Sequence, residues 1–503
     1  MAAIAIEKLM QAAGHNEPLP AELRSLAATG LEYDSRRVKP GNLFAAIHGA
    51  KFDGRTFAQQ AVANGAVAVL SDMPPLEGFH GAAWIQVPHV RRALGLASAA
   101  FYADELRGLE CIGVTGTNGK TTTATLIDTI LRTAGMVTVL VGTIEYVVAG
   151  RVETAINTTP ESVELFRMFA EGAKAGARYA TMEVSSHALA QERVAGIEFI
   201  AAAWTNLTRD HLDFHNNSME EYFAAKQRLF LPPCGAPPRI AVLNADDSWA
   251  RKLKVAPETK VIRYSAREAA DLRATKIEAT LQGLRFDLEF AGAHYAIQSA
   301  LSSRVNVHNI LAAFGVTAAL GIAPETIVKG IEACRSVPGR FERVDAGQPF
   351  GVVVDYAHTD DALRNTLESA RGLKPKRIIT VFGCGGDRDR AKRPLMGQAA
   401  GELSNLVILT SDNPRSEEPA VIINDALVGL RRTDTRTIVE PDREKAIRRA
   451  LTEAGPDDLV LIAGKGHETY QVLKDRTIEF DDREVAARIL RDFGYRTSAE
   501  RGA

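Results

Sequence analysis

Two short stretches of the sequence carry residues whose types and spacing suit chemistry, and the first is GVTGTNGKTT, beginning at Gly113. Gly116 and Gly119 allow the backbone to approach a phosphate closely, and Lys120 adds a positive charge. Thr121 offers a hydroxyl group to Mg²⁺. The stretch therefore predicts a phosphate-binding loop.

The elements around this loop are those that a phosphate site requires. The apolar run ECIGV before it predicts a strand, and residues 120–133 after it predict a helix. The loop departs from the pattern G-x-x-x-x-G-K-[ST], because Val114 stands where the first glycine belongs and Gly113 lies one position early. The alternative is an accidental Gly-Lys turn, which the strand-turn-helix setting disfavours.

The second stretch is the polar corner DNPR, which follows the apolar run VILT at residues 407–410. Asp412, Asn413 and Arg415 surround Pro414, so a carboxylate, an amide and a guanidinium stand on a chain whose direction the proline ring restricts. Because Asn-Pro is a common turn former, a solvated loop is the simpler interpretation of these residues taken by themselves.

Length and composition predict a multidomain globular protein. The 503 residues exceed one hydrophobic core and suggest about three domains. Hydrophobic residues make up 46% and charged residues 24%, which are ordinary globular values. The 60 Lys and Arg residues nearly balance the 62 Asp and Glu residues without blocks of like charge, so nucleic-acid binding has little support.

Cysteine usage and the amino terminus indicate a cytoplasmic protein. Cys111, Cys234, Cys334 and Cys384 lie far apart without a C-x-x-C pair, which fits a reducing compartment and argues against disulfides or a zinc site. The start MAAIAIEKLMQAAG lacks the features of a signal peptide, and no apolar stretch approaches the ~18 residues of a membrane span. We expect no membrane insertion.

Apolar runs alternating with helical stretches predict an α/β protein of three domains. Residues 1–100 read as a small α/β domain, residues 101–336 as a doubly wound and mainly parallel sheet that carries the phosphate loop, and residues 337–503 as a Rossmann-like α/β domain. The Pro-Gly break in SVPGRFE separates the last two domains.

Further motifs occur in order along nearly the whole chain. They are DSRRVKPGNLFAA (34–46), TGTNGKTT (115–122), NTTPE (157–161), MEVSSHALAQERV (182–194), TNLTRDHLDFH (205–215), YFAAKQRLF (222–230), VLNADD (242–247), PGRFE (338–342), DYAHTDDAL (355–363), GCGGDRDRAKRPLMG (383–397) and AGKGHETYQ (463–471). With these motifs the sequence resembles the Mur ligase family, the ATP-dependent amide-forming enzymes of peptidoglycan precursor synthesis, and hence of cell-wall biogenesis, cell shape and cell division.

Within the family, the motifs are closest to those of the members that add the third residue of the stem peptide. The resemblance implies that ATP activates the D-glutamate carboxylate of UDP-N-acetylmuramoyl-L-alanyl-D-glutamate as an acyl phosphate. The amine of meso-diaminopimelate then attacks through a tetrahedral intermediate. The implied domain roles are UDP-sugar binding for residues 1–100, ATP binding for 101–336 and amino-acid binding for 337–503.

The resemblance implies four catalytic residues, Lys120, Glu183, His211 and Lys226. Thr121, Glu183, His211 and Lys226 are the implied Mg²⁺ ligands, with Lys226 modified by CO₂ to a carbamate. Such a lysine must first be neutral, so its site should lower its pKa by burial or by nearby cations. Without the resemblance, Glu183 would read as a solvated acid, His211 as a turn residue and Lys226 as a solvent-facing lysine.

The resemblance also implies two sets of nucleotide contacts. For ATP they are Gly116, Thr117, Asn118, Gly119, Lys120, Thr121, Thr122, Asn306, Arg340 and Asp355, of which Arg340 is expected to reach ATP on domain closure. For the UDP-N-acetylmuramoyl dipeptide they are Tyr33, Ser35, Asn157, Thr158, Thr159, Ser185, Gln191 and Arg193.

The DNPR corner then acquires a function. The resemblance assigns the binding of meso-diaminopimelate to Arg388, Asp412, Asn413, Pro414, Arg415, Gly464 and Glu468. Arg415 can grip the distal carboxylate of diaminopimelate bidentately, and Glu468 suits the distal ammonium. L-Lysine lacks the distal carboxylate and would leave the guanidinium unpaired, which penalises its binding.

Three alternatives remain open. The first is the same ligase acting on L-lysine, which Arg415 disfavours. The second is a folylpolyglutamate-type ligase, which would share the phosphate loop but not NTTPE together with DNPR. The third is a nucleotide-binding module that performs no ligation. We expect a monomer with small-molecule partners, and Mg²⁺ as its metal.

Overall fold

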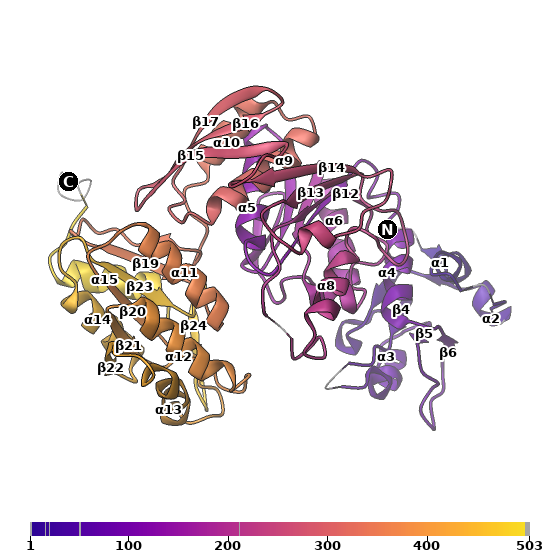
Figure 1. Ribbon diagram of the computed structural model, residues 1–503. Coiled ribbons are helices and arrows are strands. Elements are labelled where there is room, and N and C mark those ends of the chain that lie inside the picture. The colour runs from indigo at the N-terminus through magenta and orange to yellow at the C-terminus, as the bar shows by residue number, and fades with distance from the viewer. Residues whose placement is uncertain (1–2, 16, 20, 50–51, 211, 498–503) are drawn as a thin grey trace.

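The computed structural model describes residues 3–15, 17–19, 21–49, 52–210 and 212–497. In this part of the chain the strands form a four-stranded, an eleven-stranded and a six-stranded sheet, together with two two-stranded ribbons. Figure 1 shows the amino-terminal and carboxy-terminal regions on opposite sides of the central region. The predicted α/β class is confirmed.

The amino-terminal region holds a small parallel sheet in the order β3-β4-β5-β6. Its apolar residues and those of α1, α4 and part of α6 form one core. The elements are β1 (Ile4–Ala5), α1 (Ile6–Ala12), α2 (Ala21–Arg24), β2 (Ala27–Ala28), β3 (Gly30–Glu32), η1 (Ser35–Arg37), β4 (Asn42–Ala45), η2 (Gly54–Phe57), α3 (Ala58–Ala63), β5 (Ala68–Ser71), β6 (Ala83–Gln86) and α4 (Val90–Phe101).

The central sheet runs in the order β10-β9-β8-β11-β7-β12-β13-β14-β15-β16-β17. The seven strands from β8 to β15 in this order are parallel, as predicted, and an antiparallel pair extends the sheet at each edge. Separate apolar cores cover its two faces.

The strands of this region are β7 (Glu110–Thr115), β8 (Thr138–Val141), β9 (Glu145–Val148), β10 (Arg151–Thr154), β11 (Tyr179–Glu183), β12 (Phe199–Trp204), β13 (Ile240–Asn244), β14 (Lys260–Ser265), β15 (Leu272–Thr280), β16 (Gly283–Phe290) and β17 (Ala293–Ser299). The helices are α5 (Lys120–Thr133), α6 (Ser162–Lys174), α7 (Ser186–Ala190), α8 (Met219–Gln227), η3 (Ala250–Lys252), α9 (Asn306–Ala319) and α10 (Pro324–Ala333).

The carboxy-terminal sheet has the order β18-β19-β23-β20-β21-β22, and its five strands other than β18 are parallel. The elements are β18 (Glu342–Arg343), β19 (Gly351–Asp355), α11 (Asp360–Gly372), β20 (Ile378–Phe382), α12 (Lys392–Leu403), β21 (Leu406–Leu409), α13 (Pro419–Leu430), β22 (Arg436–Val439), α14 (Arg443–Glu453), β23 (Leu459–Ala463), β24 (Tyr470–Val472), β25 (Thr477–Glu479) and α15 (Asp482–Asp492). Helices cover both faces, as the predicted Rossmann-like alternation requires.

Parallel strands end at the same edge of a sheet, and this positions the predicted motifs. In the central sheet the phosphate loop follows β7 and Glu183 ends β11, the neighbouring strand. In the carboxy-terminal sheet Asp412 lies beyond β21 and Gly464 follows β23. The motifs therefore gather at two sheet edges, one in each domain.

The structure also shows the state of the cysteines and the character of the helices. All four cysteines are free thiols, and Cys111, Cys334 and Cys384 are buried. Within the described residues, no helix combines the length and the apolar character that a membrane span needs.

Candidate active site

The phosphate loop lies so close to its neighbours that its two glycines have no room for a side chain. A Cβ atom on Gly116 would lie 1.8 Å from Thr205 Oγ1, and one on Gly119 would lie 2.3 Å from Asn309 Oδ1. Both glycines also adopt positive φ, 146° at Gly116 and 84° at Gly119. Backbone amides and the start of α5 thus form the wall that a phosphate would contact.

The segment after β12 holds the loop in place. The amide of Asn118 donates to Asn206 Oδ1 at 3.0 Å, and the amide of Thr117 donates to the Asn206 carbonyl at 2.8 Å. The hydroxyl of Thr205 donates to the Asn118 carbonyl at 2.6 Å. Sequence reasoning did not assign Thr205 or Asn206, although both follow a strand next to β7 and reach the same sheet edge.

The amine of Lys120 folds back onto the loop. Its Nζ donates to the carbonyls of Gly116 at 2.9 Å and Thr117 at 2.8 Å. Burial lowers the pKa of Lys120, and the carboxylate of Glu183 opposes this change. Burial therefore disfavours the positive charge of Lys120, which lies against the loop. An anionic phosphate bound there would favour that charge.

Glu183 is a buried carboxylate held by three donors. It accepts hydrogen bonds from Thr121 Oγ1 at 3.0 Å, from the Thr143 amide at 2.7 Å and from Thr143 Oγ1 at 3.0 Å. A carboxylate beside a threonine hydroxyl is an oxygen donor set that suits Mg²⁺. The structure thus brings together two of the predicted metal ligands, and it adds Thr143, which lies after β8 at the same sheet edge.

Changing Glu183 to glutamine is expected to raise the Mg²⁺ concentration needed for half-maximal phosphate release by about 10- to 100-fold. The amide would keep the size of the side chain but would remove its charge and turn an NH₂ group toward donors. The Mg²⁺ concentration for half-maximal activity measures the effect. Glu198→Gln, at an exposed position before β12, is the matched control. An unchanged Mg²⁺ requirement in Glu183→Gln would remove this residue from the metal site.

Lys226, on α8, is buried against the other side of the loop. It is 1% exposed, its Nζ donates to the Gly116 carbonyl at 2.8 Å, and it lies 4.7 Å from the ring centroid of Tyr222. Burial lowers the pKa of Lys226 well below its usual value, and the nearby Lys120 lowers it further. The burial of this side chain and the neighbouring Lys120 agree with the predicted direction of the pKa shift, and the carbamate stays a prediction.

The remaining predicted metal ligand, His211, lies outside the described residues. In the part of the chain that the structure describes, no cluster of three or more His, Cys, Asp or Glu side chains is arranged to hold a metal ion. The predicted set differs from such a cluster, because it relies on a threonine hydroxyl and on a modified lysine.

Residues predicted for the UDP-linked substrate surround the backbone of Glu183. Thr159 Oγ1 donates to the Glu183 carbonyl at 2.9 Å and accepts from the Ser185 amide at 3.1 Å. Arg193 donates to the Thr159 carbonyl at 3.0 Å and to Gln191 Oε1 at 2.6 Å. These four residues thus form one connected group beside the candidate metal site.

The other residues of this set are more dispersed. Thr158 Oγ1 lies 3.1 Å from Thr143 Oγ1, and the Asn157 carbonyl accepts from Tyr146 at 2.6 Å. Ser35 donates to Gln60 Oε1 at 2.9 Å within the amino-terminal region. Burial and the carboxylate of Glu164 on α6 raise the pKa of Tyr33, which lies where the first and central regions meet.

The predicted ATP contacts divide between two domains. On α9, Asn309 Nδ2 donates to Asn306 Oδ1 at 2.9 Å. On α5, Thr122 is buried behind the loop. Asp355 accepts from the amides of Phe341 at 2.7 Å and Ala357 at 2.9 Å, and burial raises the pKa of its carboxyl group.

Arg340 joins the two domains at the phosphate loop. Its guanidinium donates to Thr121 Oγ1 at 3.1 Å and lies 4.7 Å from the ring centroid of Tyr356. Its buried Nε has no hydrogen-bond partner in the described part of the chain. We predicted that Arg340 would reach ATP on domain closure, and it already contacts the loop residue Thr121 in this structure. Its unsatisfied N–H group has donor capacity for an anionic ligand.

The amino-acid motifs meet at the edge of the carboxy-terminal sheet. Arg415 adopts a positive φ of 53° and donates to the Gly386 carbonyl at 2.8 Å. Arg388 lies beside it, because a Cβ atom on Gly385 would lie 3.1 Å from Arg415 NH1 and 3.7 Å from Arg388 Cγ. Among the described residues, neither guanidinium has a carboxylate within ion-pair distance, so both can bind an anionic ligand.

Asn413 and Glu468 lie at the same sheet edge, and we call this group of predicted side chains the amino-acid pocket. Asn413 Nδ2 donates to Glu468 Oε2 at 2.8 Å, and the buried Lys465 lies 3.1 Å from the same oxygen. Sequence reasoning did not assign Lys465, which lies within AGKGHETYQ three residues before Glu468. Lys465 balances the charge of Glu468 and fixes the direction of its carboxylate.

Asp412, Gly464 and Pro414 are placed by close approach. A Cβ atom on Gly464 would lie 2.6 Å from Asp412 Oδ2, and one on Gly386 would lie 1.9 Å from the Pro414 carbonyl. The loop after β21 therefore touches the loop after β23 at Gly464 and the loop after β20 at Gly386, and a larger side chain at either glycine would push the touching loops apart.

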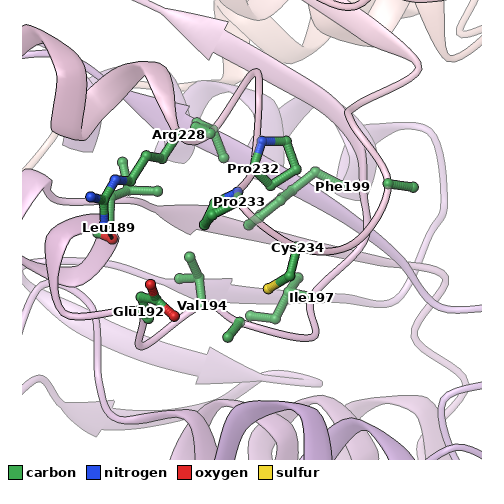
Figure 2. A pocket seen from close by; sticks show the side chains of 12 residues that line it. Leu189, Glu192, Val194, Ile197, Phe199, Arg228, Pro232, Pro233 and Cys234 are labelled. Atoms are coloured by element: carbon green, nitrogen blue, oxygen red, sulfur yellow. Dashed lines mark hydrogen bonds between the residues drawn. The ribbon is translucent and has the colours of Figure 1, made fainter. Parts of the chain in front are cut away.

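A small cavity of about 40 Å³ lies elsewhere in the central region (Figure 2). Pro232, Pro233 and Cys234 line it from the segment after α8, and Glu192 and Val194 from the segment after α7. Its lining includes no predicted site residue, and its volume is far below that of a nucleotide site. We do not assign it to the reaction.

Comparisons with known proteins cover nearly the whole chain. Residues 27–102 match the model described as Mur ligase family, catalytic domain, residues 114–317 match Mur ligase middle domain, and residues 339–466 match Mur ligase, glutamate ligase domain. The UDP-N-acetylmuramoyl-L-alanyl-D-glutamate--2,6-diaminopimelate ligase of Solibacter usitatus is 58% identical over 480 residues, which cover 95% of this chain and 96% of the relative.

Two further proteins with this name are also similar. The ligase of Syntrophomonas wolfei is 45% identical over 465 residues, which cover 92% of this chain and 94% of that protein. A solved structure of such a ligase is 33% identical, has a TM-score of 0.71, and matches over 98% of this chain and 100% of its own. The similarity therefore includes both sheet edges that carry the candidate site.

Proposed function

Because the chain belongs to the Mur ligase family, we propose that it is the ATP-dependent ligase that joins meso-2,6-diaminopimelate to UDP-N-acetylmuramoyl-L-alanyl-D-glutamate. This reaction belongs to peptidoglycan precursor synthesis. The observation that carries the choice of amino acid is the pocket beyond β21 and β23. Arg388 and Arg415 have no carboxylate partner there among the residues that the structure describes, and Lys465 and Asn413 hold Glu468 in place.

The first step is attack of the D-glutamate carboxylate on the γ-phosphorus of ATP, which gives an acyl phosphate and ADP. The chain contributes charge and orientation to this step. The loop amides and Lys120 face the phosphates, and the spare N–H group of Arg340 adds a donor from the third domain. Mg²⁺, held by Glu183 and Thr121, would neutralise phosphate charge.

In the second step the amine of diaminopimelate attacks the acyl carbon, and phosphate leaves from the tetrahedral intermediate. The guanidinium of Arg415 would grip the distal carboxylate, while Glu468 would accept hydrogen bonds from the distal ammonium. These contacts fix the far end of the substrate, so that its other amine is presented toward the acyl phosphate.

We propose that each of the three domains binds one substrate. Residues 1–100 bind the UDP end of the substrate, 101–336 bind ATP, and 337–503 bind the amino acid. The carbamate on Lys226, a monomeric state and a cytoplasmic location are parts of the same proposal. Burial lowers the pKa of Lys226 and so favours the uncharged amine with which CO₂ reacts, which supports the first of these.

Phosphate release by the purified protein tests the proposal. The assay contains ATP, Mg²⁺ and UDP-N-acetylmuramoyl-L-alanyl-D-glutamate, with meso-diaminopimelate, with L-lysine, or with neither. We expect release that depends on diaminopimelate. Release with L-lysine instead would keep the ligase and reject its selectivity, and release that ignores both amino acids would favour a non-ligating module. A parallel assay with a folate and glutamate tests the folylpolyglutamate alternative.

A further inference from the structure

Arg443 and Asp482 form a buried ion pair behind the amino-acid pocket. Arg443 begins α14, Asp482 begins α15, and both side chains are fully buried. The guanidinium donates to both carboxylate oxygens, from Nε to Oδ1 at 2.8 Å and from NH2 to Oδ2 at 2.7 Å. Neither residue lies in the motifs that carry the resemblance.

The same guanidinium also reaches the two loops of the pocket. Its NH1 donates to the Ser411 carbonyl at 3.2 Å, and its NH2 donates to the Ala463 carbonyl at 3.1 Å. Ser411 directly precedes Asp412, and Ala463 directly precedes Gly464. One side chain therefore bonds to both loops at the residue before each predicted ligand.

The order of the strands explains why these loops need such a link. Ser411 lies beyond β21 and Ala463 ends β23, and β20 lies between these two strands in the sheet. Neighbouring strands are about 4.8 Å apart, so the two loops start about 10 Å apart. Gly383, after β20, has no side chain and so leaves room for the direct contact of Asp412 with Gly464. Arg443 connects the same two loops through its hydrogen bonds to Ser411 and Ala463.

We propose that the Arg443–Asp482 pair positions the two loops of the amino-acid pocket at the separation that the distal end of diaminopimelate requires. This inference rests on the proposed function. Arg443 is a positioning residue rather than a catalytic one, because it reaches the substrate only through the loops. Asp482 fixes the orientation of the guanidinium, so that NH1 and NH2 stay directed at the carbonyls of Ser411 and Ala463.

The alternative is that this pair only stabilises the fold. The two roles predict different effects of removing the pair on substrate binding. Replacing both partners of a buried ion pair by apolar residues is often neutral or stabilising, whereas removing one partner is costly. The double variant Arg443→Met/Asp482→Leu should therefore fold while lacking the bonds to Ser411 and Ala463. A pair that served stability alone would leave substrate recognition unchanged in this variant.

The sheet offers a matched control at its opposite end. Arg377, just before β20, donates to Asp458, just before β23, through Nε and NH2, and Asp458 is buried. The variant Arg377→Met/Asp458→Leu removes the same pair of groups from the same sheet. It lies at the amino ends of the strands, away from the pocket.

The experiment compares KM for diaminopimelate, ATP and the UDP-linked substrate in the wild type and both double variants. We expect Arg443→Met/Asp482→Leu to raise KM for diaminopimelate by about 10- to 100-fold while the other two KM values stay unchanged. The preference for diaminopimelate over L-lysine should fall in parallel. The control variant should keep all three KM values.

An unchanged KM for diaminopimelate in the folded double variant would overturn the inference. If that variant does not fold, Arg443→Lys provides the test, because lysine keeps a charge beside Asp482 but lacks the planar fork that reaches both carbonyls. A wild-type KM for diaminopimelate in Arg443→Lys would then overturn it. A wild-type protein without diaminopimelate-dependent phosphate release would instead overturn the proposed function.

Discussion

Lys226→Ala is expected to lower the turnover rate by about 10³-fold. The structure buries Lys226 between Tyr222 and the Gly116 carbonyl, and the neighbouring Lys120 disfavours a second positive charge. Both influences lower the pKa of Lys226 and so favour the uncharged amine, which can form an N–C bond to CO₂ with loss of a proton. The same charge on Lys120 would attract a carbamate anion, so the predicted modification would replace a repulsive contact between two cations by an attractive one.

Two measurements check this prediction. Added formate or acetate should partly restore phosphate release in Lys226→Ala, because a small carboxylate can occupy the space of the carbamate. Carbon-13 NMR of the wild type in labelled bicarbonate should show a carbamate signal that the variant lacks. Lys174→Ala, at an exposed position at the end of α6, is the control and should behave as the wild type. Full activity of Lys226→Ala would contradict the assignment.

Arg415→Ala is expected to lower kcat/KM for diaminopimelate by about 10²- to 10³-fold. The wild-type guanidinium donates from NH1 to the carbonyls of Gly386 and Asn413, and its Nε and NH2 groups remain for the distal carboxylate of the substrate. Removing the guanidinium leaves that carboxylate desolvated without a partner. The weak reaction with L-lysine should change little, because lysine has no group at that position.

Steady-state kinetics with both amino acids measure the effect as a ratio of kcat/KM values. Arg390→Ala is the matched control, since Arg390 lies two residues from Arg388 but is exposed and pairs with Asp425. An equal loss with diaminopimelate and L-lysine would assign Arg415 to the fold of the loop. A selective loss with diaminopimelate supports its role in recognition.

The phosphate loop was predictable from sequence because its parts are close along the chain. Strand, glycines, lysine and helix follow one another within residues 110–133, and local rules decide their structure. The parallel sheets were predictable for a similar reason, since apolar runs alternate with helical periodicity. The antiparallel edge strands β9, β10, β16 and β17 were not identified. β10 is exposed along its whole length and β17 has exposed polar residues on one face, so these two resemble loops in sequence.

The environment of the site residues required the structure. The stretch AAKQRLF reads as a solvent-facing helix, and Lys226 is buried because Gly116, 110 residues away, lies against it. Thr143 was missed because it binds a carboxylate that another motif supplies. Lys465 lies in the same motif as Glu468, but the sequence does not show that its amine is buried and turned toward that carboxylate. Arg443 was missed since its role depends on the order of the strands, which the sequence does not show directly.

A competition experiment with the wild-type protein tests directly whether it joins meso-diaminopimelate in preference to L-lysine. Equal concentrations of meso-diaminopimelate and L-lysine are supplied with ATP, Mg²⁺ and UDP-N-acetylmuramoyl-L-alanyl-D-glutamate, and the products are identified by mass spectrometry. The pocket of Arg388, Arg415 and Glu468 predicts that the diaminopimelate product predominates by about 10²-fold or more. A predominance of the lysine product, or the absence of any amide product, would contradict this account.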